Sequence, residues 1–254
     1  MRTIVSWVGR VLLFFMCLLA GPAATLLTGQ VDLEQHWSNA SHARLRLAPE
    51  PAATPEAVVQ VYAARAFNWR GLFSVHTWIA TKGVRADHYL VYHVLGWRAQ
   101  SGGDSVVVAR GYPDRQWYGN PPKRLAEVRG AQAEVAIARI RTAIAEYPYS
   151  RAYRIWPGPN SNTFVAYVGR RVPELQLNLP ANAIGKDYRG ADGLVGVTPS
   201  GGGGQISLAG VVGLSASLVE GWEVNILGLG FGINPHSGAL RLPGIGELLL
   251  GRRG

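Results

Sequence analysis

Four short apolar runs in the first half of the chain most constrain how it can fold. They are rich in Val, Ile, Tyr and Trp, are separated by Gly, Asn, Asp or Ser, and cover residues 58–65, 72–81, 89–97 and 105–110. These residue types and short separations favour an antiparallel meander of strands. The first run is also rich in alanine, so a helix is an alternative for that run alone.

Two helices are expected after the strands, beyond a basic loop over residues 111–123. Residues 131–147 carry apolar side chains at helical spacing, and Pro148 ends the pattern. The second helix is expected over residues 161–171, with two arginines at its carbonyl end. Strands followed by helices indicate an α+β fold rather than a βαβ repeat.

The C-terminal part differs in composition from the rest. Residues 190–204 are rich in glycine and predict a flexible connection. Residues 206–218 and 222–233 are alternating apolar segments around Glu220-Gly221, which predicts one long hairpin packed on the main domain. The many glycines of these segments indicate either close packing or contact with a membrane.

An uncharged apolar stretch covers residues 11–27. Arg2 and Arg10 precede it, and Asp32 and Glu34 follow it, so we expect a membrane segment with the bulk of the chain exported. An uncleaved anchor is favoured because no clean A-x-A cleavage site is present. We therefore expect a protein of the bacterial inner membrane that faces the periplasm, with secretion after signal cleavage as the alternative.

Charge and cysteine content restrict the partners and the chemistry. The formal charge is +9, but the basic residues are scattered, which favours an anionic membrane surface over a nucleic acid as partner. The only cysteine, Cys17, lies in the apolar stretch, so the exported part has no disulfide, thiolate metal site or cysteine nucleophile. The expected division is a signal or anchor (1–27), a linker (28–55), an α+β domain (56–190) and a Gly-rich hairpin segment (191–254).

A site is best predicted at the start of the second helix. Trp156-Pro157-Gly158-Pro159 stops the preceding segment, and Asn160 or Ser161 can cap the helix and leave a hydroxyl at its positive end. An ordinary helix start has the same composition, so a purely structural cap is the alternative.

The segments VYAARAFNWRG, FSVHTWIATK, WPGPNSNTF and AIGKDY resemble an uncharacterised bacterial family of membrane-associated proteins with no assigned activity. A more distant resemblance starts from His76-Thr77-Trp78-Ile79 on one strand and Tyr92-His93 on the next. This pattern is similar to the histidine strands of circularly permuted papain-like enzymes, which include relatives of lecithin:retinol acyltransferase.

In those enzymes the nucleophile follows at a helix start, in a pattern like Asn-Cys-x-x-Phe-Val. Residues 160–165 have this spacing, with serine in place of cysteine. The resemblance implies Ser161 as nucleophile, His76 as base and His93 as the second polar position. A serine hydroxyl does not ionise as a thiol does, so it would need His76 as general base, an orienting group and oxyanion donors such as Asn160 or a backbone N–H.

Each of these residues also has a structural interpretation. His76 can be a buried histidine bonded to a carbonyl, and His93 can pack under Trp97. Trp78 and Tyr92 fit a core, and Lys186-Asp187 fits a solvated ion pair as well as the rim of a cleft. The residues expected to contact a ligand are Asn160, Asn162, Trp78, Tyr92, Lys186 and Asp187.

Two functions follow from this reading. The favoured one is a noncatalytic or weakly catalytic envelope protein of papain-like architecture that binds an envelope ligand or partner. The alternative is a membrane-tethered amidase, esterase or acyltransferase that uses Ser161 and His76 on an envelope peptide or lipid. No metal or cofactor is expected, because the sequence has neither a metal-ligand pattern nor a phosphate loop.

Overall fold

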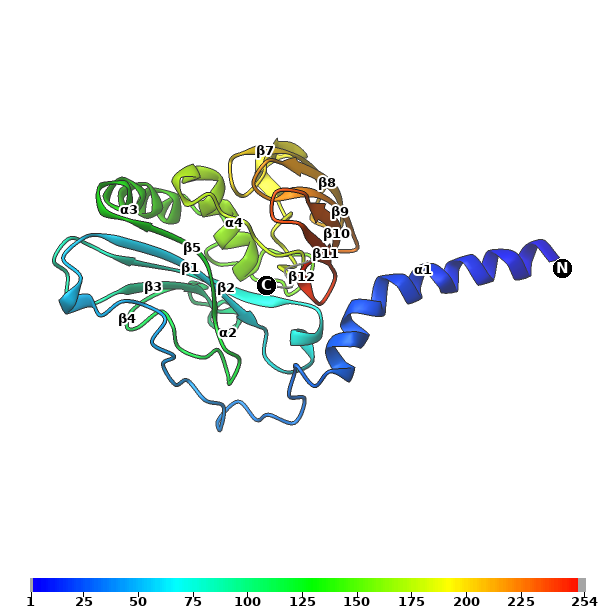
Figure 1. The fold of residues 1–254 in the computed structure, drawn as a ribbon, viewed down its shortest axis with the longest axis horizontal. Coiled ribbons are helices and arrows are strands. Elements are labelled where there is room, and N and C mark those ends of the chain that lie inside the picture. The colour runs from blue at the N-terminus through cyan, green and yellow to red at the C-terminus, as the bar shows by residue number, and fades with distance from the viewer. Residues whose placement is uncertain (1, 251–254) are drawn as a thin grey trace.

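The computed structural model describes residues 2–250 and contains two antiparallel sheets, one of which carries helices on one face (Figure 1). The mixed α and β composition agrees with the expected α+β class. A long N-terminal helix, α1 (Arg2–Leu27), projects away from the remainder of the molecule.

The first sheet forms the centre of the molecule. Its strands are β1 (Val58–Arg65), β2 (Val75–Lys82), β3 (Leu90–Val94), β4 (Val106–Arg110) and β5 (Lys123–Arg129), in the order β4-β3-β2-β1-β5. The predicted meander is confirmed by β1–β4, and the helical alternative for residues 58–65 is wrong. The second strand begins later than predicted because Asn68–Leu72 forms a short 3₁₀ helix.

β5 was not predicted. Only its first residue fell in the predicted basic loop 111–123, and the rest of the segment, with four charged residues among seven, was assigned to no element. The strand lies at the edge of the sheet and pairs with β1 alone, so these side chains remain near solvent. A charged edge strand has weak apolar alternation, which explains why the pattern did not reveal it.

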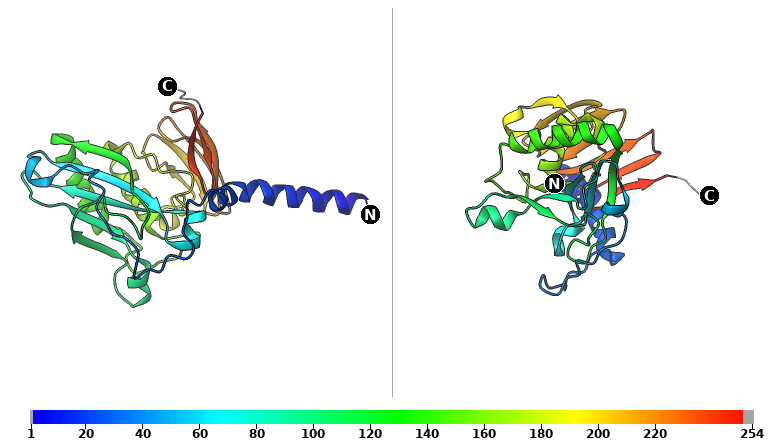
Figure 2. Two further views of the ribbon diagram at one scale, coloured as in Figure 1. Left: turned by 60° about the horizontal axis from the view of Figure 1, so that its bottom comes forward. Right: turned by 90° about the vertical axis from the view of Figure 1, so that its left-hand side faces the viewer.

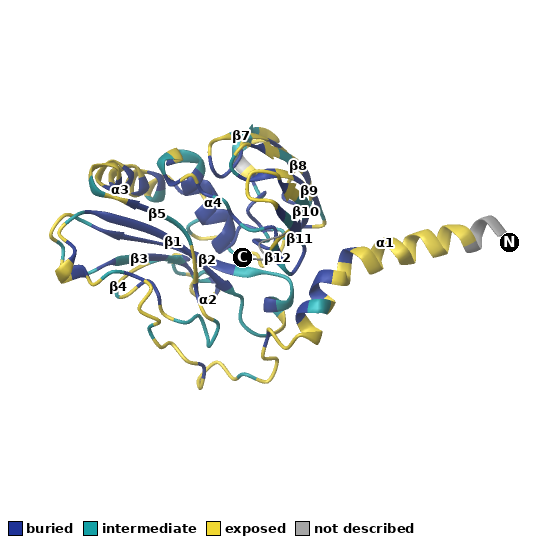
Figure 3. Ribbon diagram, viewed as in Figure 1, coloured by how far each residue is buried: buried dark blue, intermediate teal, exposed yellow. Residues whose placement is uncertain are grey.

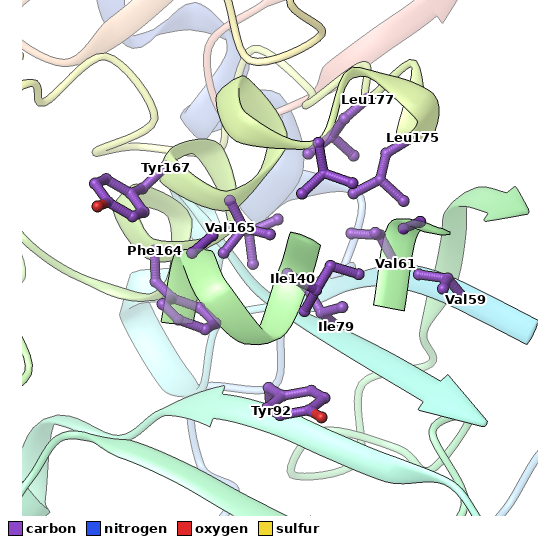
Figure 4. Close-up of a cluster of buried hydrophobic side chains, with 14 of the residues drawn as sticks. Val59, Val61, Ile79, Tyr92, Ile140, Phe164, Val165, Tyr167, Leu175 and Leu177 are labelled. Atoms are coloured by element: carbon purple, nitrogen blue, oxygen red, sulfur yellow. The ribbon is translucent and has the colours of Figure 1, made fainter. Parts of the chain in front are cut away.

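Two helices cover one face of the first sheet. α3 (Gly130–Ala145) and α4 (Ser161–Arg171) confirm the two predicted helices, and the short α2 (Gly96–Gln100) follows β3. Figure 4 shows the core between α3, α4 and the sheet, which includes Val61, Ile79, Tyr92, Ile140 and Phe164. The core fixes the position of the α4 N-terminus relative to β2.

The opposite face of the first sheet is covered by extended chain. Trp78 Nε1 donates to the Pro113 carbonyl at 2.8 Å, and Tyr89 Oη donates to the Pro49 carbonyl at 3.0 Å. The Ala48 N–H donates to Asp114 Oδ2 at 2.9 Å, which ties the two covering segments together. Part of the predicted linker 28–55 therefore packs on the body of the protein.

The second sheet has seven strands in sequence order. They are β6 (Val195–Val197), β7 (Gly203–Leu208), β8 (Val212–Ser217), β9 (Gly221–Ile226), β10 (Leu229–Asn234), β11 (Ala239–Leu242) and β12 (Gly246–Leu249). The prediction of one long hairpin is therefore wrong. Only the turn between β8 and β9 lies where it was expected.

The missed turns interrupt both predicted segments. Leu227 and Gly228 connect β9 to β10, and both have positive φ angles of 55° and 81°. The pairing of Ile226 with Leu229 makes this a two-residue turn of the type that suits the twist of a hairpin. Leucine at its first position hides the turn in an apolar run, since Asn or Asp would be the usual signal.

The base of α1 contacts the β11–β12 turn. Thr25 Oγ1 donates to the Gly244 carbonyl at 3.4 Å, and Gly21 lies so close to the Pro243 carbonyl that a Cβ there would collide with it. The second sheet stands beside the base of α1 (left view of Figure 2), and most of α1 is exposed (Figure 3). Within the described residues, Ser6–Leu27 is the one helical segment long and apolar enough to cross a membrane.

Candidate functional site

The N-terminus of α4 is held by an asparagine cap. Asn160 Oδ1 accepts from the N–H groups of Asn162 at 2.9 Å and Thr163 at 3.1 Å, and Thr163 Oγ1 accepts from the Asn160 N–H at 3.1 Å. These bonds form a capping box. Gly185 has a positive φ of 98°, and a side chain there would collide with the Asn160 amide. The predicted cap is therefore Asn160, with Ser161 as the first helical residue.

The Asn162 side chain joins α4 to β2. Its Nδ2 donates to the carbonyls of Val75 at 3.0 Å and Ile184 at 2.8 Å, and its Oδ1 accepts from Thr77 Oγ1 at 3.0 Å. Thr77 Oγ1 also lies 3.2 Å from the Ser161 carbonyl. The amides of Asn160 and Asn162 are thus engaged within the fold, although both residues line the cleft described below.

Ser161 has free polar groups at this helix end. Among the described residues, neither its hydroxyl nor its N–H makes a hydrogen bond, while its neighbours Asn160 and Asn162 are fully bonded. The residue is 4 % exposed and lines the cleft. A hydroxyl and an N–H at the positive end of a helix can bind an anionic or carbonyl oxygen.

His76 and His93 form a pair under an aromatic cover. His76 Nε2 lies 3.3 Å from His93 Nδ1, and the two rings are nearly parallel at 5.6 Å. The Trp117 ring stacks on His76 at 3.8 Å between centroids. His76 Nδ1 has no hydrogen-bond partner among the described residues, so one nitrogen of the pair is available to a ligand.

Burial keeps both imidazoles neutral. It lowers the pKa of His93 to about 4, and burial together with the neighbouring His93 lowers the pKa of His76 well below its usual value. A neutral pair needs one N–H donor and one acceptor at the shared bond. If His76 donates from Nε2, its Nδ1 carries a lone pair directed away from His93.

The strand register separates the histidines from Ser161. Val75, Ile79 and the other odd-numbered residues of β2 face the core beneath α4, whereas Trp78 packs in the cluster on the opposite face. Since side chains alternate along a strand, His76 lies on the Trp78 side and Thr77 on the α4 side. The structure brings His76 and His93 together, but it forms no hydrogen bond between Ser161 and either histidine.

A cleft of about 900 Å³ joins these groups at the end of β2. Its polar lining residues are Arg70, Ser74, His76, Gln100, Asn160, Ser161 and Asn162. Five tryptophans line it, namely Trp37, Trp69, Trp97, Trp117 and Trp156. Its other large apolar or aromatic side chains include Phe67, Phe73, Tyr118, Tyr153, Ile155, Leu227 and Leu229. The cleft is therefore mainly apolar, with few polar groups, as is typical of small-molecule sites.

The tryptophan walls were not predicted as part of the site. They come from loops and short helices of distant segments, so no local motif unites them. One signal was present in the sequence, because Trp69 and Trp156 lie outside the predicted strands and helices. In the structure both side chains are about half exposed. A large aromatic side chain outside the core often marks a contact surface.

Trp78 and Tyr92 lie in the interior. Trp78 is 2 % exposed and packs on the stacked rings of Tyr62 and His76, so it supports the histidine pair from below. Tyr92 belongs to the core beneath α4. Neither side chain lines the cleft.

Lys186 and Asp187 lie in a buried ion network, and the expectation of a solvated pair is wrong. Lys186 Nζ contacts Asp187 Oδ2 at 3.2 Å and also pairs with Glu223 of β9. Burial lowers the pKa of Lys186, but the two carboxylates outweigh it and raise that pKa overall. The pair joins the loop after α4 to the second sheet and does not line the cleft.

No group of three or more His, Cys, Asp or Glu side chains within the described part of the chain is arranged to hold a metal ion. The groups that line the cleft are hydroxyl, amide, imidazole, indole and phenol groups and the guanidinium of Arg70.

Comparison with known proteins identifies one family. A family model described as "Protein of unknown function (DUF3750)" matches residues 56–188, which include β1–β5, α2–α4 and the polar residues of the cleft. Searches of curated proteins and of solved structures found no significant match. The match covers more than half of the chain and agrees with the expected uncharacterised family, so the chain belongs to the DUF3750 family of proteins of unknown function.

Proposed function

We propose that this protein is a membrane-anchored envelope protein that binds an amphiphilic ligand in its tryptophan-lined cleft. One observation carries the proposal, namely a cavity of about 900 Å³ with mainly apolar walls and a few polar groups, which include Arg70, His76 and Ser161. An acyl chain or another apolar body would lie along the indoles. A polar end would accept hydrogen bonds from the free Ser161 groups or donate one to His76 Nδ1.

The noncatalytic form of this function is supported by the position of the histidines. A serine nucleophile needs its base within hydrogen-bond reach, and His76 approaches the cleft from the opposite face of the first sheet. The neutral pair, with His76 buried and His93 partly buried, suits a rigid wall, and in the tautomer that donates from Nε2 the His76 Nδ1 atom is an acceptor. We include in this proposal a papain-like architecture in which Ser161 stands in place of the nucleophilic cysteine.

The membrane location rests on α1. Ser6–Leu27 provides 22 residues, which matches the roughly 20 needed to cross a bilayer. The base of α1 is packed on the body through Gly21 and Thr25, which supports a retained anchor over a cleaved signal. With Arg2 and Arg10 in the N-terminal part of α1 and the acids Asp32 and Glu34 after it, the body would face the periplasm of the bacterial inner membrane.

Retention of lipid by the purified full chain tests the binding function. The protein is exchanged extensively in a mild detergent, and native mass spectrometry records the amphiphile that stays bound. We expect the parent to retain a defined ligand and Trp69→Ala, which removes a cleft wall, to lose most of it. Val135→Ala is the control, since Val135 is similarly exposed but lies on α3 outside the cleft. An empty parent, or equal retention by Trp69→Ala, would contradict the proposal.

A second candidate is acyl transfer or hydrolysis at the same cleft, with an amide or ester of an envelope peptide or lipid as substrate. It is favoured by the unbonded Ser161 hydroxyl and N–H at the start of α4, which could serve as nucleophile and oxyanion donor. A rearrangement would have to bring His76 Nδ1 to the hydroxyl.

Labelling of the full chain with a fluorophosphonate probe tests this candidate. Activation by His76 predicts label on the parent and none on Ser161→Ala or His76→Ala, with both variants folded by circular dichroism. Label that persists in Ser161→Ala would exclude this nucleophile. We expect no label on the parent, because the geometry supports the binding function best.

A further inference from the structure

The second sheet has an inverted distribution of polarity. Side chains on its outer face are apolar, and six of them are between 41 % and 62 % exposed: Ile206, Leu208, Leu214, Trp222, Val224 and Ile233. The register places them on neighbouring strands β7–β10, on one side of the sheet. A sheet with one face in water normally presents the polar side outward.

The inner face carries the polar side chains instead. Residues 194–250 contain four charged side chains, and three of them, Glu220, Glu223 and Arg241, are buried. The fourth, Glu247, is bonded to Arg241 at 2.7 Å and is only partly exposed. The outer face of the sheet therefore offers no charge to water, in a chain whose net charge is +9. Such a continuous apolar surface indicates contact with another apolar phase.

The contact with α1 fixes where this face lies. The sheet meets the helix at Gly21 and Thr25 through the β11–β12 turn. A span from Ser6 to Leu27 places both residues in its last turns, at the boundary between the acyl chains and the headgroups. The sheet stands on the side of the body from which α1 extends (Figures 1 and 2). The second sheet therefore lies beside the membrane that α1 crosses.

We propose that the outer face of the second sheet rests on the lipid surface of the membrane that α1 crosses. The proposal rests on α1 being retained as an anchor, and it adds a second contact that fixes the orientation of the body. Trp222 and the surrounding aliphatic side chains insert at the acyl–headgroup boundary, where indole rings are favoured.

This seating also places the cleft beside the bilayer. Leu227 and Leu229, at the β9–β10 turn, line the cleft, and Leu229 faces the same side of the sheet as Val224 and Ile233. The apolar face and the cleft wall are thus continuous. An amphiphile held in the leaflet can enter the cleft along these leucines without crossing water.

Site-specific fluorescence quenching in membranes tests the contact. The full chain with Cys17→Ala is reconstituted into vesicles of phosphatidylcholine and phosphatidylglycerol, with a single cysteine carrying the environment-sensitive label NBD. The test positions are Leu214→Cys and, as a second site, Val224→Cys. Val135→Cys on α3 is the matched control, because it is similarly exposed but lies outside the second sheet.

We expect lipids with brominated acyl chains to remove most emission at positions 214 and 224, and aqueous iodide to remove little. Position 135 should show the reverse. Iodide access at 214 and 224 equal to that at 135 would overturn the proposal. Protection from iodide without quenching by the brominated lipids would also overturn it, because a protein surface, such as a second copy of the chain, would then cover the face. Loss of the cleft ligand in Trp69→Ala leaves these quenching results unchanged, so the two proposals fail separately.

Discussion

At the scale of single residues, the two stacked imidazoles make the site sensitive to acid. His76 and His93 share one hydrogen bond and lie beneath Trp117, where a positive charge would be poorly solvated. Protonation of either ring also places a charge beside its partner. Protonation of the pair therefore destabilises the folded state.

This arrangement predicts a loss of stability on mild acidification. Burial lowers the pKa of His93 to about 4, whereas histidine in the unfolded chain titrates near 6.5. Between these values the unfolded chain binds a proton that the folded chain does not, so the free energy of unfolding falls as pH falls through this window. The contribution of His93 to the free energy of unfolding is fully retained above about pH 6.5. Its loss at lower pH reaches roughly 3 kcal/mol.

Replacement of His93 by Asn should remove this contribution, since an amide can keep a hydrogen bond to His76 but does not titrate. Thermal unfolding of the full chain in detergent, measured from pH 7.5 to pH 4.5, checks it. We expect the Tm of His93→Asn to fall less than that of the parent across the range. His236→Asn, which changes an exposed histidine, should follow the parent. Parallel curves for the parent and His93→Asn would show that His93 does not supply the acid sensitivity.

At the scale of elements, the sequence predicted what local chemistry encodes. The ends of α4 were predicted to the residue, because Pro159, the Asn160 cap and Arg170-Arg171 all act within one turn of the helix. The β9–β10 turn was not predicted because Leu227 adopts a positive φ, and leucine is not a residue type that indicates such a turn. β5 was not predicted because a charged edge strand lacks the apolar alternation of an inner strand.

The site shows the same division between local and tertiary information. That His76 and His93 would lie close together follows from two neighbouring strands with alternating side chains. Whether Ser161 could reach them depends on which face of the sheet α4 covers, and the spacing of residues along the chain does not contain this. The five tryptophans of the cleft likewise come together only through packing of distant loops.

At the scale of the whole molecule, buried charges connect the second sheet to the body. Glu223 of β9 pairs with Lys186 from the loop after α4 and with Arg241 of β11, whose Nε lies 2.7 Å from Glu223 Oε2. Burial raises the pKa of Glu223, but the two cations outweigh it and lower that pKa overall. The apolar face of the sheet points outward because these paired charges occupy its inner side.

Removing the shared carboxylate should therefore loosen the whole molecule. Glu223→Gln leaves Lys186 and Arg241 buried near each other with fewer negative partners, and breaking such a pair costs roughly 3 to 5 kcal/mol. For a chain of this size we expect a Tm decrease on the order of 10 °C, measured by circular dichroism of the full chain in detergent. Glu50→Gln is the control, because Glu50 pairs with Arg44 at the surface and should change the Tm little. If both variants melt together with the parent, the buried network is not what holds the sheet to the body, and packing of the strands alone must orient its apolar face.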